Sequence, residues 1–238
     1  MDLEEIKSKI DREFTKATEK FDAWHRKVAY GKSNYKDAAK LADYSGKAMA
    51  DIIIKNLDDV GMMPTEAELI GLIPPALRTN YDYLVPCIEN VQRQINEKAK
   101  VGLKPVIPAF NSDRAIGLAK EIASKDTVGE YQDLLRNQII NNSINVIDEA
   151  IEGNARQHDY AGLEVTVERE YDGVGLHDGK DTCNWCLERA GNWSYADAKA
   201  NGVFQRHPGC GCQIIYTSER GPELQTDWTS NTWTRIVR

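Results

Sequence analysis

The chain has 238 residues, a net charge of −7 and 41% hydrophobic residues, so it can bury a core and is too apolar for a disordered protein. No apolar run is long enough to span a bilayer, and the charged start (MDLEEIKSKIDREF) lacks the features of a signal peptide. We therefore expect a protein made in a cytosol, with no membrane partner. Residues 151–200 carry more acidic than basic side chains, which disfavours contact with a nucleic-acid backbone.

Apolar residues recur every three or four positions over residues 2–28, which predicts one long amphipathic helix. The positions concerned are Leu3, Ile6, Ile10, Phe14, Ala17, Phe21, Trp24 and Val28. Several of them lie seven residues apart, a spacing typical of packing along another helix. Packing within the chain is the simpler interpretation, and self-association of two chains through this helix is the alternative.

More helices are expected as far as residue 152. The predicted ranges are 36–58, 77–99, 112–124 and 128–151, with a kink or restart of the second of these at Pro86. A further short helix is predicted from Pro64, with Thr65 as its N-cap and Pro74-Pro75 at its end. Residues 101–111 contain two prolines and are expected to form a connector.

The pattern changes at Gly153-Asn154. Residues 162–171 alternate between apolar and polar side chains, which predicts a half-buried strand, and residues 213–217 predict a second strand. Ser194 is a candidate N-cap for a short helix between them. The residues from Ser218 onward are polar apart from Trp228 and Trp233, and we expect a tail that orders against a partner.

Four of the five cysteines lie within thirty residues of one another. Cys183 and Cys186 form a C-x2-C pair, and His207, Cys210 and Cys212 follow twenty residues later as H-x2-C-x-C. In a reducing compartment such a cluster is more typical of a metal site than of disulfides. Zinc binds four sulfur or nitrogen ligands in a tetrahedron, and each motif can present its ligands from one tight turn.

Five candidate ligands compete for four places. Cys183, Cys186, His207 and Cys210 are favoured because they form two equivalent turns, and Cys212 is the alternative because an extended C-x-C segment points both side chains to one face. A structural zinc site is the preferred interpretation, since a catalytic zinc keeps one position for water. Disulfides or reduced core thiols are the other interpretation.

The remaining candidates for chemistry are less specific. His177 and Asp178 lie in a glycine-rich sequence, and one interpretation is an acid–base pair. The favoured interpretation is that one of them orients a metal ligand or that they face water. Asp181 is expected to cap backbone amides. His25 and His158 are expected on the surface or on helix faces, and Cys87 is expected to be a small buried apolar side chain.

These observations predict an α+β protein. Residues 1–152 are expected to form a mainly helical region, residues 153–217 a small zinc-stapled α+β module, and residues 218–238 an extended C-terminal tail.

The segment from the first strand to the second resembles a known module. The order strand, YDGVGLHDGKDTCNWC, short helix and FQRHPGCGCQIIY is similar to the C-terminal module of phage head-morphogenesis proteins, the Mu F-like minor capsid proteins. The matching positions are Asp181, Cys183, Cys186, His207, Pro208, Cys210 and Cys212. Many members of the family have an arginine between the last two cysteines, where this chain has Gly211, a difference that leaves the metal ligands in place.

The resemblance covers about residues 160–217 and implies a non-enzymatic minor structural protein of a tailed-phage virion. Such a protein is located inside the head or near the portal, with the portal or the major capsid protein as partner. Packaged DNA is a less favoured partner because of the acidic composition. The alternative is a zinc-dependent hydrolase or nuclease of a phage or toxin system, with His177 and Asp178 beside an open metal.

Overall fold

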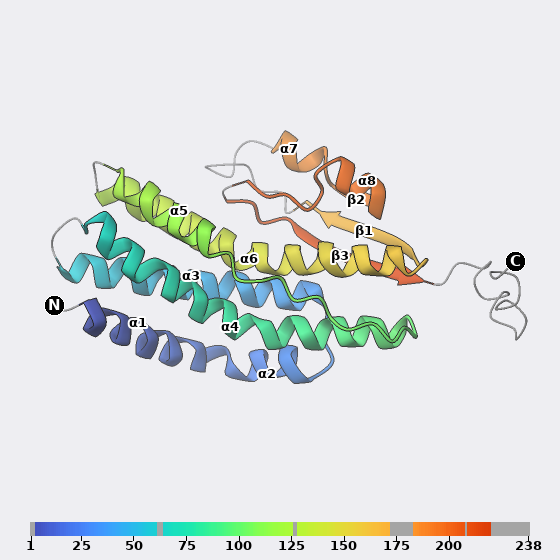
Figure 1. Ribbon diagram of the computed structural model, residues 1–238, viewed down its shortest axis with the longest axis horizontal. Coiled ribbons are helices and arrows are strands. Elements are labelled where there is room, and N and C mark those ends of the chain that lie inside the picture. Colours follow the sequence, from blue (N-terminus) through green and yellow to red (C-terminus); the bar gives the residue numbers. More distant parts are fainter. Residues whose placement is uncertain (1–2, 61–63, 126–127, 172–182, 208, 220–238) are drawn as a thin grey trace, which may run out of the picture.

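The computed structural model describes residues 3–60, 64–125, 128–171, 183–207 and 209–219. Long helices dominate the first two thirds of the chain and lie along its long axis (Figure 1). They are α1 (Leu3–Thr18), α2 (Asp22–Tyr30), α3 (Tyr35–Val60), α4 (Glu66–Lys98), α5 (Ser112–Ala123) and α6 (Val128–Tyr160), with a 3-10 turn (Glu19–Phe21) between α1 and α2. None of the described helices is both long enough and apolar enough to cross a membrane.

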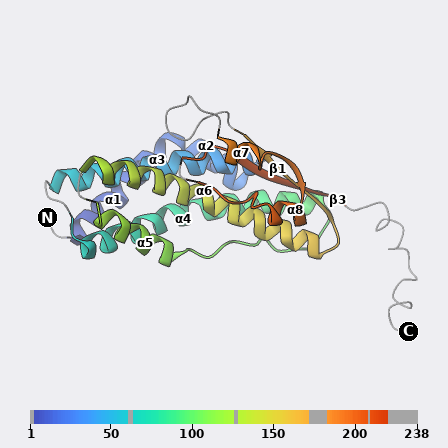
Figure 2. The same cartoon turned by 90° about the horizontal axis from the view of Figure 1, so that it is seen from above.

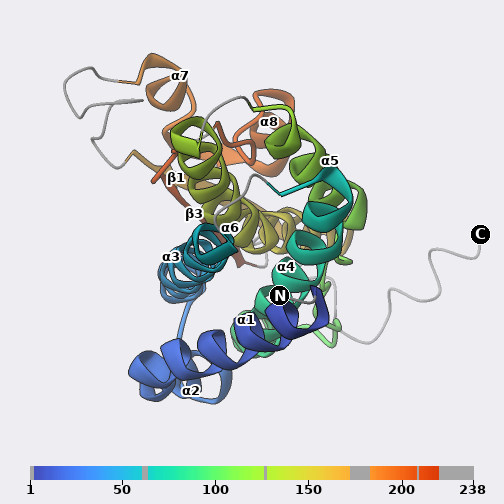
Figure 3. The ribbon, with the colours of Figure 1, turned by 90° about the vertical axis from the view of Figure 1, so that its left-hand side faces the viewer.

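A small antiparallel sheet follows the helices. It consists of β1 (Glu164–Glu170), β2 (Gly191–Ser194) and β3 (Gln213–Glu219) in the order β2-β1-β3, with two short helices, α7 (Asn184–Leu187) and α8 (Tyr195–Ala200). The sheet lies on the opposite side of α3 and α6 from α1 and α2 (Figures 1 and 3). The predicted α+β class and both predicted strands are therefore confirmed, whereas β2 and α7 are too short to have been predicted.

The amphipathic stripe at the N-terminus is buried within the chain. Ile6, Ile10 and Phe14 are at most 6% exposed, and α1 packs against α3 and α4. The prediction of a single helix over residues 2–28 is wrong in one respect, because the 3-10 turn at Glu19–Phe21 divides it. The apolar periodicity thus serves intramolecular packing, which was the simpler interpretation.

Helix α4 continues through its three prolines. Thr65 caps it as predicted, since its hydroxyl accepts a hydrogen bond from the backbone N–H of Glu68 and the Glu68 carboxylate accepts one from Thr65. The predicted end at Pro74-Pro75 and the possible restart at Pro86 are wrong. Most residues around these prolines are buried (Leu72, Ile73, Ala76, Leu77, Leu84, Cys87 and Ile88). Burial of this face offsets the backbone hydrogen bonds that the prolines remove.

Helix α6 runs nine residues beyond the predicted end at Ile151, so the expected boundary between residues 152 and 153 falls inside a helix. The reason is the connector of residues 101–111, which returns along the bundle from α4 to α5 (Figures 1 and 2). A Cβ atom at Gly153 would lie 3.0 Å from a methyl group of Val106. The Asn154 amide donates to the Val106 carbonyl at 2.8 Å and accepts from the Val106 N–H at 2.7 Å. Gly153 and Asn154 therefore hold the connector against the helix.

One hydrophobic cluster joins the helices to the sheet. Its members come from α2, α3, α4, α6, α8, β1 and β3, and include Val28, Leu41, Ile88, Ile147, Val167, Ile214 and Tyr216. Cys87, which is fully buried in α4, belongs to the same cluster, as predicted for a small apolar side chain. The sheet consequently shares its core with the helical region.

A buried polar network crosses this core. The Gln92 amide of α4 accepts from the Tyr35 hydroxyl at 2.8 Å and donates to the Tyr216 hydroxyl at 2.6 Å. His158 is fully buried beside them, with Nε2 at 2.7 Å from Asn96 Oδ1 and Nδ1 at 2.6 Å from Ser218 Oγ. His158 lies on helix α6, as one of the two expectations had it, but the alternative of a surface position is wrong. Uncharged partners on α4 and β3 satisfy both nitrogens of the neutral ring.

Acidification is expected to destabilise the fold through His158. Burial lowers the pKa of His158 from its ordinary value of 6.5, so the unfolded chain binds this proton at a higher pH than the native protein does. The free energy of unfolding should be highest above pH 6.5 and fall below it, by at most about 1.4 kcal/mol per pH unit. Urea unfolding at pH 7.5 and pH 5.5 should show a smaller difference for His158→Gln than for the wild type. An equal difference in both proteins would contradict this assignment.

Candidate metal centre

Two tight turns bring the metal-ligand candidates together. In the first, the Cys186 N–H donates to the Cys183 carbonyl at 3.1 Å; in the second, the Cys210 N–H donates to the His207 carbonyl at 3.2 Å. Gly209 has a φ of 74°, the left-handed conformation that the third position of such a turn requires and that glycine adopts without strain. The two motifs therefore form two tight turns of different conformation, since the first opens the short helix α7 and the second contains a left-handed glycine.

The ligand atoms of the two turns converge. His207 Nε2 lies 3.3 Å from Cys183 Sγ and 3.0 Å from Cys186 Sγ, and Cys186 Sγ lies 3.7 Å from Cys210 Sγ. Metal–ligand bonds of about 2.3 Å to sulfur and about 2.0 Å to nitrogen place the ligands of a tetrahedral zinc about 3.5–3.8 Å apart. The observed spacings approach these values, so neighbouring ligand atoms of the cluster are close enough to share an ion.

All five candidates take part in the cluster. They form two overlapping groups that share Cys186, one with Cys183 and His207 and the other with Cys210 and Cys212, and within each group the ligand atoms lie within 4.8 Å of one another. The four cysteines are at most 4% exposed, and His207 is partly buried. Cysteine and histidine side chains of this cluster, among them Cys186, Cys210, Cys212 and His207, could therefore bind a metal ion. Cys183 belongs to the same cluster through its contact with His207.

None of the four cysteines of the cluster forms a disulfide with another described residue. Burial raises the pKa of the Cys186 thiol to about 12. The contact with the Cys212 side chain, and after it the charge of Arg206, lowers the pKa of the Cys210 thiol to about 4, although burial opposes this. The site thus favours a thiolate at Cys210, the form in which cysteine binds metals.

Arg169 is a buried cation in direct contact with the cluster. It is 1% exposed on the inner face of β1. Its Nη1 donates to the carbonyl oxygens of Val203 and Gln205 at 2.5 and 2.6 Å, and its Nη2 lies 3.3 Å from Cys210 Sγ and 3.9 Å from Cys186 Sγ. Among the described residues, no carboxylate lies within ion-pair distance of this guanidinium.

Arg206 attaches the second turn to the helical bundle. Its side chain and that of Asp148 on α6 are 1% and 3% exposed and form a two-point ion pair through Nε and Nη2. Arg206 Nη1 also donates to the Cys210 carbonyl at 3.2 Å. The Asn141 amide of α6 donates to the His207 carbonyl at 3.3 Å. Asp148 raises the pKa of Arg206 against the effect of burial, so the guanidinium stays charged.

Trp185 covers the cluster from within the first motif. Its ring meets the His207 ring nearly at a right angle, with 5.3 Å between centroids and 83° between the ring planes. The guanidinium carbons of Arg169 and Arg189 lie 5.1 and 4.0 Å from the Trp185 ring centroid. The aromatic ring therefore contacts two cations and a ligand candidate. The attraction between a guanidinium and the face of an aromatic ring stabilises both positive charges.

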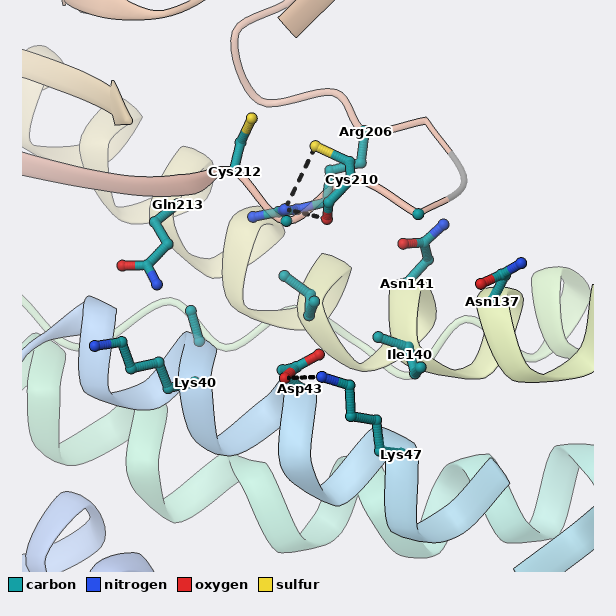
Figure 4. Close-up of a pocket in the computed structure, with 14 residues that line it drawn as sticks. Lys40, Asp43, Lys47, Asn137, Ile140, Asn141, Arg206, Cys210, Cys212 and Gln213 are labelled. Atoms are coloured by element: carbon teal, nitrogen blue, oxygen red, sulfur yellow. Dashed lines mark hydrogen bonds and ion pairs between the residues drawn. The ribbon is translucent and has the colours of Figure 1, made fainter. Parts of the chain in front are cut away.

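A cavity of about 330 Å³ adjoins the second turn. Lys40, Asp43 and Lys47 of α3 line one side, Asn137 and Asn141 of α6 another, and residues 209–213 the third (Figure 4). Figure 4 shows the sulfur atoms of Cys210 and Cys212 pointing away from α3. The cavity therefore meets this turn on the side opposite its sulfurs.

Several predicted residues lie outside the part of the chain that the structure describes. These are His177, Asp178, Asp181 and Pro208, together with Trp228 and Trp233 of the tail. His25 packs on the Tyr83 ring, with 4.0 Å between centroids, and is away from the cluster.

Sequence reasoning missed Arg169, Arg206 and Asp148. A signal for Arg169 was present, because strand alternation places it on the same face as the buried Val165 and Val167. A similar signal marked Asp148, which lies one turn from the buried Ile144 on α6.

No protein-family model matches the sequence, and no curated protein or solved structure shows significant similarity to it.

The buried pair of Asp148 and Arg206 is expected to be essential for stability. Asp148→Ala leaves a desolvated guanidinium without its counter-charge and should lower the free energy of unfolding by about 3–5 kcal/mol. Asp82→Ala, which removes an exposed partner of Arg78, is the control and should cost less than about 1 kcal/mol.

The double variant Asp148→Leu with Arg206→Met should be more stable than Asp148→Ala, because no unpaired charge remains. Denaturant unfolding measures all of these differences. A cost below about 1 kcal/mol for Asp148→Ala would contradict the assigned role.

Proposed function

We propose that this protein is a minor structural protein of a tailed-phage virion, without enzymatic activity, whose C-terminal part is held together by one structural Zn²⁺ ion. The observation that carries the metal proposal is the convergence of buried cysteine sulfurs and one imidazole from two turns. Thiolate and imidazole ligands in a closed site of this kind are typical of structural zinc.

The proposed ion would join two turns that are twenty residues apart in the sequence. The first turn leads into the four-residue α7, and the second leads directly into β3. A sheet of three strands with two short helices buries little apolar surface of its own, and a bound metal contributes folding free energy to such a unit. Arg206 and Asn141 then connect the stapled turns to α6.

The virion assignment rests on the resemblance of residues 160–217 to the Mu F-like minor capsid proteins. The order of β1, the C-x2-C turn, the short helix α8, the H-x2-C-x-C turn and β3 is consistent with that layout. Tyr30, Tyr44 and Tyr160 are 74%, 55% and 83% exposed and offer aromatic contacts to a partner such as the portal or the major capsid protein. Burial of the α1 stripe gives less support to self-association through that helix.

The geometry gives less support to a zinc-dependent hydrolase or nuclease. Catalysis by a metal needs a coordination position that water or substrate can reach. Here the four clustered cysteines are almost fully buried, and the adjoining cavity approaches the second turn on the side away from the sulfurs.

Loss of a metal ligand should unfold the region around the sheet. Cys183→Ser removes a thiolate and should forfeit an apparent metal-binding free energy of order 10 kcal/mol. Cys87→Ser, which changes a buried thiol away from the cluster, is the matched control and should cost only about 1–3 kcal/mol. The readouts are zinc content by elemental analysis and thermal unfolding with zinc present. Equal thermal stability of Cys183→Ser and the wild type would refute the closed site.

The structural role should be visible in particles. If the protein is a virion component, disrupted particles from cells that express a tagged copy should yield it together with the portal or the major capsid protein. An unrelated tagged protein from the same cells serves as the control for trapping. Consistent absence from purified particles would refute the virion assignment while leaving the metal proposal intact.

A further inference from the structure

Among the described residues, the charges buried around the cysteine cluster do not cancel without a contribution from the cluster itself. Arg169 is 1% exposed and so is the side chain of Arg206, and Asp148 is the one buried carboxylate among the described residues in contact with them. Within this part of the chain, two cations and one anion leave one positive charge uncompensated. A buried charge of this kind is costly unless a counter-charge lies close to it.

The cluster can provide that counter-charge. A divalent ion bound by three thiolates and one neutral imidazole carries a net charge of −1, which balances the excess positive charge. Four thiolates would give −2 and leave an uncompensated negative charge. The charge balance therefore favours a site with His207 and three of the four clustered cysteines over one formed by cysteines alone.

Arg169 is placed to act on this centre directly. It contacts one sulfur from each turn, Cys186 from the first and Cys210 from the second, through a single nitrogen. Its other terminal nitrogen is fixed by the carbonyl oxygens of Val203 and Gln205. A guanidinium anchored in this way is fixed in position beside both sulfurs.

We propose that Arg169 is a positioning residue of the metal centre, which compensates the charge of a three-thiolate, one-imidazole site and sets the spacing of Cys186 and Cys210. This inference rests on the proposed metal site. Arg206 has a different role, because Asp148 balances its charge.

The test compares two arginines that pack on the same aromatic ring. Arg169 and Arg189 both lie over Trp185, but Arg189 Nη1 donates to the Trp185 carbonyl, whereas Arg169 Nη2 contacts the two sulfurs. Full-length wild type, Arg169→Gln and Arg189→Gln are loaded with Zn²⁺, and metal affinity is measured by competition with a chromophoric chelator. Arg169→Gln should bind zinc about 10–100-fold more weakly, and Arg189→Gln should match the wild type.

A spectroscopic readout separates positioning from general destabilisation. In the Co²⁺-loaded protein, hydrogen bonds from Arg169 lower the energy of the sulfur electrons, so their removal should shift the sulfur-to-cobalt charge-transfer band to longer wavelength. Arg189→Gln should leave the band unchanged. The wild-type spectrum should also show tetrahedral coordination by three sulfurs and one nitrogen.

Each outcome decides one question. Wild type that binds neither metal refutes the proposed site itself. Wild type that binds zinc, with Arg169→Gln folded by circular dichroism and equal in affinity and spectrum, overturns the role of Arg169. If Arg169→Gln does not fold, Arg169→Lys is compared with Arg189→Lys, since lysine retains the charge but cannot hold both sulfurs and both carbonyls. Weaker binding in Arg169→Lys alone supports the proposal, and equal binding in both overturns it.

Discussion

The arrangement of the C-terminal third depends on the compensation of buried positive charge. Two guanidinium groups lie out of solvent beneath the turn at His207–Cys210, and each requires a negative partner because desolvation of a charge is costly. Asp148 on α6 meets this requirement for Arg206, and the sulfurs of Cys186 and Cys210 face Arg169. Arg206 thereby attaches the turn to the helical bundle, and Arg169 lies between the sulfurs and the Trp185 ring.

Helix α6 is the element through which these contacts reach the rest of the molecule. Its Asp148 and Asn141 hold the second turn, its Asn154 holds the connector, and its His158 lies between α4 and β3. One helix therefore positions the cysteine cluster and the polar network together. The neutral network is the part that responds to acidification, because protonation of His158 would place a charge within it.

Local sequence patterns predicted those features of the structure that depend on residues close together in the sequence. Strand alternation identified β1, the cap at Thr65 identified the start of α4, and the two short motifs identified the cysteine cluster. The continuation of α4 through Pro74 and Pro75, and of α6 through Gly153, depends on surfaces that approach from elsewhere in the chain. Periodicity along one segment does not contain that information. For the same reason, Arg169 and Asp148 appeared as ordinary charged residues until their partners were known.

The shared core also constrains how the protein is made. Strand β3 packs against α3 and α6, although it follows both helices by many residues in the sequence. On a ribosome, the apolar faces of α3 and α6 would emerge long before the strand that covers them. A nascent chain would thus expose an apolar surface from the synthesis of α3 until that of β3, and we expect chaperones to bind it in that interval.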